Sequence, residues 1–431
     1  MQLKTPPMKQ KTAIATWTIT LLTFSIGLSS RLNNMALATH PDSSFKFSDM
    51  ALAPKQANPN GKLVSANTQF GFRLFSEMVK TSKNQNVFFS PASVAIALSM
   101  LYNGASGATQ QEMSTAMALG GIDLGAINAA NQSLRGSLQN ADTKVQLSIA
   151  NSLWARQGFS FRHQFLKNTR QFYQAQVTNL DFASPDAVGI INLWVEESTQ
   201  GKIAQIVDRI NPDDAMFLIN AIYFKGTWTK PFDKTQTAQQ PFYLSDGTSK
   251  QHPLMYRQGN YRYYENQQFQ AVSLPYGSGR LSLYVFLPKQ NSNLNAFLGQ
   301  LNAQNWNQWL SQFQNQKGVV KIPRFKLEYE IELKNALAAL GMKTMFDGTK
   351  AEFTALTSEP VRVDRVKHKT LVEVNEEGTE ASAVTSAGMQ VTSADPSNPF
   401  SMVVERPFFC AIRDEQTGTI VFMGAIVAPK T

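Results

Sequence analysis

Cysteine is almost absent from this chain of 431 residues, because Cys410 is the single copy. The chain therefore makes no internal disulfide, and its stability has to come from a core, for which 43% hydrophobic residues are ample. Cys410 lies in the apolar run 407–412, which favours a buried thiol over a nucleophile. Histidine is also rare, with four copies, and neither a Gly-x-Ser-x-Gly nor a His-Glu-x-x-His motif occurs. An enzyme, a metal site and a cofactor are all disfavoured.

Runs of like charge are absent as well. The net charge is +9, but Lys and Arg are scattered without a run of five or six. Such a distribution favours a solvated surface over a nucleic-acid or polyanion site.

Long apolar runs are missing except near the N-terminus, where Ala13–Leu28 follows three lysines. The Ala36-Leu37-Ala38 triplet then fits a signal-peptide cleavage site. A membrane anchor is the alternative, but the stretch is short for a bilayer, contains Thr and Ser, and is followed by Arg31. We therefore expect residues 1–38 to be a signal peptide and the protein to be exported, extracellular or periplasmic, with no membrane span.

The remaining sequence indicates one large domain. Residues 39–61, rich in proline, form an expected extended leader, and 62–431 contains no linker and no internal repeat. Helical periodicity dominates before residue 200, and from Ala215 onward the pattern changes to strands. Helices followed by strands, without regular alternation, predict an α+β fold. The strands expected in the second half are 215–226, 241–257, 261–275, 280–287, 318–329, 361–374, 402–413 and 419–427.

About 26 residues between the strands ending at Val374 and beginning near Ser401 form an unusually long connection. From Thr379 to Ala387 every second residue is small, and no proline occurs before Pro396. This period of two is typical of a strand. The segment is therefore either a strand held in reserve or an ordinary surface loop. The small set is Thr379, Ala381, Ala383, Thr385 and Ala387.

Several long motifs, in order over about residues 62–429, resemble the serpin family. Glu376-Glu377-Gly378-Thr379-Glu380-Ala381 is similar to its hinge, and Pro407-Phe408-Phe409 with Thr419–Gly424 to its C-terminal signature. Upstream, Asn86–Ser93, Asn103–Thr109 and Asn220–Trp228 match its second helix, the turn after that helix, and a central strand.

The resemblance implies a serpin fold with three β-sheets, about nine helices and an exposed reactive-centre loop at about 376–400. It also implies irreversible suicide inhibition of serine proteases, with cysteine proteases as a second class. A protease cleaves the loop, forms an acyl-enzyme, and is trapped when the loop enters the main sheet as an extra strand. The native fold would then be metastable. The resemblance implies a monomer.

The resemblance also assigns residues to roles. The breach is Trp228, for which a plain core tryptophan is the alternative. The shutter is Ser90, Ser93, Asn220 and His368; without the resemblance, Ser90 is an ordinary N-cap and His368 a structural histidine. The hinge comprises Glu376, Gly378, Thr379, Glu380, Ala381, Ser382 and Ala383.

The reactive bond is expected at Thr392-Ser393, since in the family it lies sixteen residues after the glutamate that opens the hinge. Val391 and Met389 are the alternatives if the register slips. Threonine suits neither a trypsin-like nor a chymotrypsin-like pocket, so elastase-like or subtilisin-like targets are favoured. The segment 123–139 holds Arg135 as its one basic residue, so no heparin-type site is evident.

A family member that has lost inhibition and acts as a carrier, storage protein or chaperone is the other hypothesis. Such members often have bulky or charged residues near the hinge or prolines in it. Neither occurs around Thr379. Inhibition is therefore favoured.

Overall fold

The computed structural model describes residues 61–82, 84–379 and 399–431. All of them belong to the larger of two units, Gln56–Thr431; the other is Met1–Lys55. The expected signal peptide and nearly all of the expected leader therefore lie outside the described residues. No helix in the described part is long and apolar enough to cross a membrane.

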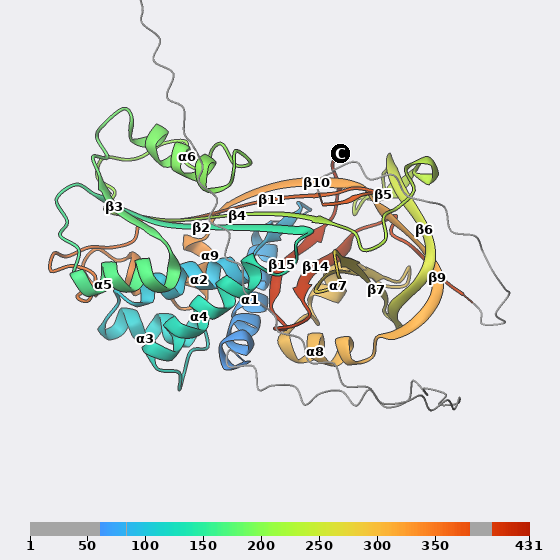
Figure 1. The fold of residues 1–431 in the computed structure, drawn as a ribbon, viewed down its shortest axis with the longest axis horizontal. Helices are drawn as coiled ribbons and strands as arrows, with labels where there is room; N and C mark the ends of the chain where they lie inside the picture. Colours follow the sequence, from blue (N-terminus) through green and yellow to red (C-terminus); the bar gives the residue numbers. More distant parts are fainter. Residues whose placement is uncertain (1–60, 83, 380–398) are drawn as a thin grey trace, which may run out of the picture. The chain divides into compact units, whose positions relative to one another are not determined.

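Nine α-helices occur in the described part, and four precede the first long strand (Figure 1). The helix at 91–102 begins where the sequence predicted it, because the Ser90 hydroxyl accepts a hydrogen bond from Ser93 N and Pro91 needs no partner for its nitrogen. The helices are α1 (Gly61–Thr81), α2 (Pro91–Tyr102), α3 (Gly107–Ala116), α4 (Leu124–Gln139), α5 (His163–Asn168), α6 (Ala187–Ser198), α7 (Leu294–Leu298), α8 (Ala303–Ser311) and α9 (Lys334–Ala339).

One sheet runs in the order β10-β11-β4-β2-β3, with β12 also paired to β4. The strands β4 and β11 are parallel to each other, β10 is antiparallel to β11, and β2 is antiparallel to β4 but parallel to β3. The strands are β2 (Val145–Arg156), β3 (Gln176–Leu180), β4 (Met216–Thr227), β10 (Phe325–Glu332), β11 (Arg365–Val374) and β12 (Gly378–Thr379).

The other described strands form a nine-stranded network in the order β1-β15-β14-β8-β7-β6-β9-β13, with β5 beside β6. The long strand β6 is common to two parts of this network, so the second and third of the expected sheets are continuous through it. The strands are β1 (Val87–Phe89), β5 (Ala238–Tyr243), β6 (Ser249–Glu265), β7 (Phe269–Tyr276), β8 (Leu281–Pro288), β9 (Gln314–Pro323), β13 (Phe400–Val403), β14 (Phe408–Asp414) and β15 (Ile420–Ile426). The expected α+β class is confirmed.

Two expected strands are each divided at a proline. The strand expected at 318–329 is β9 and β10, which belong to different sheets and are separated at Arg324, directly after Pro323. The strand expected at 402–413 is β13 and β14, with Pro407 before β14. Proline cannot donate to a ladder, so each is a natural end point. The residues of the expected strands 241–257 and 261–275 form three strands, β5, β6 and β7, because the chain leaves the sheet at 244–248 and 266–268, whereas β6 is continuous through the expected break at 258–260.

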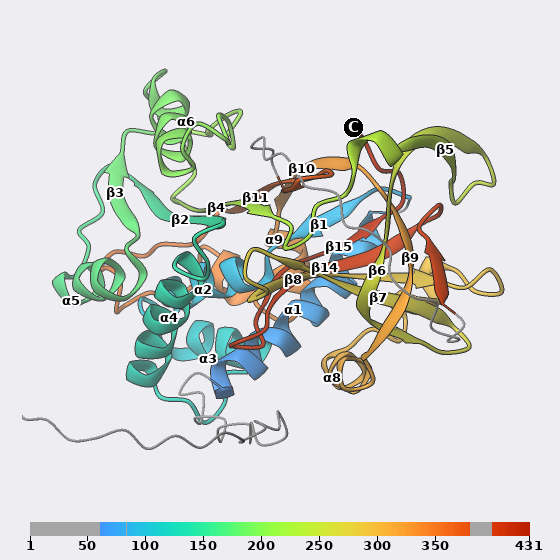
Figure 2. The ribbon, with the colours of Figure 1, turned by 45° about the vertical axis from the view of Figure 1, so that its right-hand side comes forward.

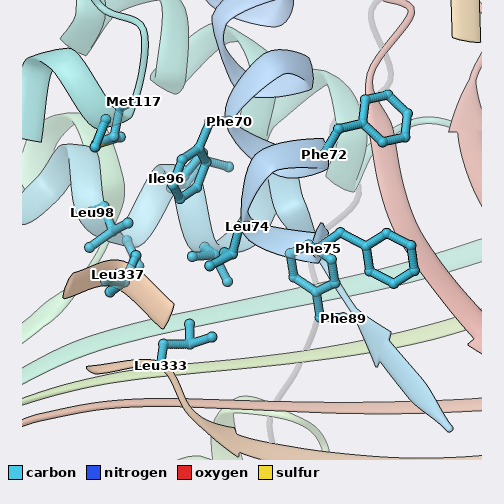
Figure 3. Close-up of a cluster of buried hydrophobic side chains, with 14 of the residues drawn as sticks. Phe70, Phe72, Leu74, Phe75, Phe89, Ile96, Leu98, Met117, Leu333 and Leu337 are labelled. Carbon is cyan, nitrogen blue, oxygen red and sulfur yellow. The ribbon is translucent and has the colours of Figure 1, made fainter. Parts of the chain in front are cut away.

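A large hydrophobic cluster joins the helices to the sheets. Figure 3 shows Phe70, Leu74 and Phe75 of α1 beside Ile96 and Leu98 of α2, over the long strands of the sheet. The buried residues of α2 lie all round it, which explains its nearly uniform apolar sequence. This central helix therefore carries its N-terminal serines directly to the sheet.

Candidate functional site

The hinge begins with a turn that reverses the chain between β11 and β12. Asn375 N donates to Gly378 O (2.7 Å), and the Asn375 side chain accepts from Glu377 N (3.0 Å). Gly378 has φ +147°, and a Cβ there would lie 2.1 Å from the carbonyl oxygen of Gly226. Only glycine fits this approach. The turn lets Gly378 and Thr379 pair antiparallel with Thr227 and Gly226 of β4.

Glu376 is held at the base of this turn. Its side chain is 2% exposed, and one carboxylate oxygen accepts from Arg324 Nη2 (2.5 Å) and Thr237 Oγ1 (2.6 Å). Burial alone would raise the pKa of Glu376, but the hydrogen bonds from Arg324 and Thr237 outweigh it and lower the pKa. The carboxylate is therefore charged, and it ties the hinge to the break between β9 and β10.

Trp228, the predicted breach residue, directly follows β4 and holds the same turn by two hydrogen bonds. Its indole N–H donates to Asn375 O and its backbone N–H to Glu377 O, each at 2.8 Å. The indole stacks on Tyr276, with ring centroids 4.3 Å apart and planes at 13°. The Tyr276 hydroxyl lies 3.1 Å from Thr379 Oγ1, and burial raises the pKa of Tyr276. Thr379 is fully buried.

The predicted shutter residues form one hydrogen-bonded chain. Ser90 N donates to His368 Nε2 (3.0 Å), and His368 Nδ1 lies 2.6 Å from Asn220 Oδ1. Because Nε2 accepts, the proton of the neutral ring is assigned to Nδ1. The Asn220 amide nitrogen then donates to Ser93 Oγ (2.6 Å) and Asn151 Oδ1 (2.5 Å). This network joins α2 to three adjacent strands, β2, β4 and β11.

Burial keeps the imidazole of His368, and with it this hydrogen-bonded network, uncharged. Desolvation lowers the pKa of His368 to about 3, although the interaction with Asn220 acts in the opposite direction. A second proton on Nε2 would face the backbone N–H of Ser90, so the imidazolium form has no place in this arrangement.

The structure thus brings together Glu376, Gly378, Thr379 and Trp228 in one place and the four shutter residues in another. The hinge residues Glu380, Ala381, Ser382 and Ala383, and the expected reactive bond Thr392-Ser393, lie outside the described residues.

Four important partners were not identified from the sequence. Asn151 lies in no motif or strand that was predicted from the sequence, and its pairing opposite Asn220 depends on the register of β2 and β4. Arg324, Thr237 and Tyr276 are far from the hinge in sequence and reach it through tertiary packing alone.

Neither a cation site nor an activated nucleophile is seen among the described residues. No group of three or more His, Cys, Asp or Glu side chains in residues 61–82, 84–379 and 399–431 could hold a metal ion. Cys410 is fully buried in β14, and burial raises its pKa, so its thiol is not a thiolate.

Comparisons with known proteins agree with this geometry. A family model described as "Serpin (serine protease inhibitor)" matches residues 65–429. Leukocyte elastase inhibitor A of Rattus norvegicus is 31% identical over 381 residues, covering 85% of this chain and 100% of that protein. Among solved structures, the thermophilic serpin tengpin in the native state gives a TM-score of 0.80 at 29% identity, covering 85% of this chain and 94% of the other. Human thyroxine-binding globulin, complexed with its ligand, gives a TM-score of 0.79 at 26% identity, covering 86% of this chain and 100% of the other.

Proposed function

Because this chain belongs to the serpin family, we propose that it is not an enzyme but an irreversible inhibitor of serine proteases, acting by cleavage of the segment 376–400 and its insertion into the sheet. The observation that carries the proposal is the position of β12. Gly378 and Thr379 already pair with the end of β4, at the point where β4 and β11 separate. The hinge is thus the first part of a strand whose remaining path lies between β4 and β11.

The register of β12 defines what insertion would place inside. Thr379 is opposite Gly226, so continuing the ladder puts residues 380–389 opposite residues 225–216. Ala381, Ala383, Thr385 and Ala387 would then share the inner face of the sheet with Thr379. The small residues that recur at every second position from Thr379 are therefore those that would face the core, where only small side chains fit. This match supports the interpretation of the segment as a strand that enters the sheet after cleavage.

Insertion also has a hydrogen-bonding rationale. The parallel ladder of β4 and β11 consists of seven registered pairs, from Arg365 opposite Phe217 to Leu371 opposite Tyr223. A strand inserted between them would replace it by two antiparallel ladders, which are somewhat more stable for each residue. The native arrangement would then be a kinetically trapped state of higher free energy.

The shutter explains why the trapped state persists. Parting β4 from β11 breaks the contact between Asn220 and His368, and both side chains are buried. Leaving such groups without partners costs about 1–3 kcal/mol each. The network therefore contributes to the barrier, and Thr385 would lie opposite Asn220 after insertion.

Covalent complex formation tests the function directly. Incubation with subtilisin, elastase, trypsin and papain should give SDS-resistant complexes with subtilisin or elastase, because no Arg or Lys occurs between Val384 and Glu405. Mass spectrometry of the released C-terminal peptide should find Ser393 at its N-terminus. A start at Gln390 or Thr392 would move the reactive bond to Met389 or Val391, and a start outside 387–396 would refute the register.

A carrier function is the second candidate, because thyroxine-binding globulin is among the similar structures. Melting temperatures measured before and after cleavage within 387–393 distinguish an inhibitor from a carrier. An inhibitory fold should melt at a clearly higher temperature after cleavage, since the freed strand enters the sheet. A nicked protein that melts at or below the intact temperature would favour the carrier.

We also propose that the protein is exported to a periplasm or the extracellular space and acts as a monomer. The supporting observation is the charge and hydropathy pattern of residues 1–38. N-terminal sequencing of the exported protein should begin at Thr39, and a mature chain that retains Ala13–Leu28 would contradict export with cleavage.

A further inference from the structure

A pocket opens at the end of the nine-stranded network where β1 and β14 begin and β8 and β15 end. It has a volume of about 590 Å³ and lies between the last turn of α1, the start of α7 and the hairpin that joins β5 to β6. This volume is within the range of about 300–1,000 Å³ that small-molecule sites usually have. None of the described hinge and shutter residues lines the pocket, so it is separate from the site described above.

The floor of the pocket is aliphatic, because it is the edge of the main hydrophobic cluster. Val87 of β1 is paired with Ala425 of β15, so their side chains share one face of the sheet, and both belong to the cluster that α1 covers. Figure 2 shows β1, β15, β14 and β8 in this order, with α1 beside them. Val79 of α1 and Leu294 of α7 extend the same apolar surface into the pocket. Such a floor favours the aliphatic part of a ligand.

Arg406, in the connection between β13 and β14, is the single charged residue among the described residues that line the pocket. The end of β8 fixes its guanidinium, since Nε and Nη2 both donate to Pro288 O, at 3.0 and 2.7 Å. The carboxylate of Glu405 is outside the lining, and its Oε1 is 3.8 Å from Arg406 Nη1, too far for a hydrogen bond. Nη1 donates to no other described residue, so the guanidinium is held in place with donors available to an anion.

Tyr243 lies at the mouth of the pocket. It is one of three large apolar side chains that are exposed in the described part of the chain, and 49% of its surface is accessible. Its backbone N–H donates to Glu405 O (2.7 Å), which holds the end of β5 beside the residue before Arg406. An aromatic ring that the core does not bury is therefore available to cover a ligand that reaches Arg406.

We propose that this pocket binds an amphiphilic carboxylate, a single aliphatic chain that ends in a carboxylate group, as in a fatty acid. The carboxylate accepts hydrogen bonds from Arg406, and the chain lies on the aliphatic floor between α1 and α7. A guanidinium and a carboxylate form strong, charge-assisted hydrogen bonds. A cationic ligand would find no carboxylate in the described lining, and a small inorganic anion would leave the apolar floor uncovered.

The pocket is also connected to the end of the segment that a protease would cleave. Arg406 follows β13, which begins at Phe400, and its hydrogen bonds to Pro288 tie the connection after β13 to β8. A ligand on Arg406 would therefore rest against the chain that carries the far end of this segment. Binding itself does not depend on inhibition, so it is testable even if the proposed function fails.

Isothermal titration calorimetry of the intact protein with octanoate, decanoate and dodecanoate, each below its micelle concentration, tests the proposal. One saturable site is expected, with an affinity that rises about four-fold for each added CH₂, because a buried CH₂ is worth about 0.8 kcal/mol. Decan-1-ol, which has the same chain without the charge, should bind about ten-fold or more weakly than decanoate. The absence of a saturable site, equal affinities for decanoate and decan-1-ol, or no dependence on chain length would each overturn the proposal.

Two variants locate the ligand. Arg406→Gln should weaken decanoate about ten-fold or more and leave decan-1-ol nearly unchanged, so the alcohol reports whether the pocket is intact. Unchanged decanoate binding by Arg406→Gln would overturn the role of the guanidinium.

Ser292→Phe places a ring in the pocket and should weaken both ligands, which keeps the location testable if Arg406→Gln does not fold. Its matched control is Ala296→Phe, at an exposed position of α7 outside the lining, which should bind like wild type. Equal effects of Ser292→Phe and Ala296→Phe would overturn the location. Binding that appears only after residues 39–60 are removed would mean that this segment of the chain fills the pocket, and would also overturn the proposal.

Discussion

Replacing His368 by glutamine should remove a specific part of the acid sensitivity of the native fold. An amide offers one acceptor for Ser90 N and one donor for Asn220 Oδ1, so His368→Gln keeps the hydrogen-bonding pattern without a titrating group. In the native protein burial lowers the pKa of His368 to about 3. In the unfolded chain the imidazole has an ordinary pKa of about 6.5.

The sign follows from proton binding. Because the folded-state pKa lies below the unfolded-state pKa, the unfolded chain binds the proton first as the pH falls. The contribution of His368 to stability is therefore complete above pH 6.5 and is lost progressively between pH 6.5 and 3. At pH 5 the loss is about 2 kcal/mol, from 1.5 pH units at roughly 1.36 kcal/mol each.

The assay is urea unfolding from the native state, followed by tryptophan fluorescence at pH 7.5 and 5.0. Wild type should lose about 2 kcal/mol more than His368→Gln between the two pH values. His252 also titrates, but its contribution is common to both proteins and cancels in the difference. His163→Gln, at an exposed position, should follow wild type. A pH-dependent difference below about 0.5 kcal/mol would refute a neutral, buried imidazole as the shutter's titrating group.

The other predictions concern the hinge and the breach. Thr379→Arg should reduce the yield of SDS-resistant protease complex by ten-fold or more, because it buries a cation beside β4. The control Thr379→Ser should retain most of the yield. Equal yields from the two variants would contradict insertion. Glu376→Gln should lower the free energy of unfolding by about 1–2 kcal/mol, since Arg324 is 40% exposed and solvent screens part of the pair. Its melting temperature should fall less in 1 M NaCl than in low salt relative to wild type, and a salt-independent difference would argue against an ion pair. Trp228→Phe should cost about 1 kcal/mol by removing the indole donor of the Asn375 carbonyl oxygen, which would keep only the longer bond from Gly378 N (3.3 Å). Unchanged thermal melting would exclude that role.

The sequence predicted the elements better than their pairing. The N-cap at Ser90 and the change from helices to strands near Ala215 depend on local chemistry, and both are seen in the structure. The division between β9 and β10 was missed, although Pro323 marks it, because the apolar pattern continues on both sides of Arg324. Which sheet a strand joins depends on long-range contacts that local pattern does not contain.

The candidate site shows the same limit. Resemblance to a family identified Trp228 and the shutter residues through motifs, since these residues lie in recognisable runs. Asn151 and Arg324 do not lie in any such motif. Asn151 hydrogen-bonds Asn220 because the register of β2 sets the two residues opposite each other, and Arg324 reaches Glu376 from the connection between β9, which ends at Pro323, and β10.

Two parts of the site control different quantities in the proposed mechanism. The shutter hydrogen bonds of His368 and Asn220 exist before the strands part, so weakening them should mainly lower the barrier to insertion, with or without cleavage. The small residues after Thr379 meet the core only afterwards, so enlarging them should mainly raise the energy of the inserted state and of late steps leading to it. Ala383→Glu should therefore leave the lifetime of the uncleaved native protein unchanged while it converts inhibitor into substrate. His368→Ala should shorten that lifetime, measured as spontaneous loss of inhibitory activity at 37 °C, while complexes made by the remaining native protein stay stable. If both variants shortened the lifetime of the uncleaved protein, or both converted the inhibitor into a substrate, the shutter and the small residues would not control separate steps. That result would contradict the separation indicated by the positions of β11 and β12.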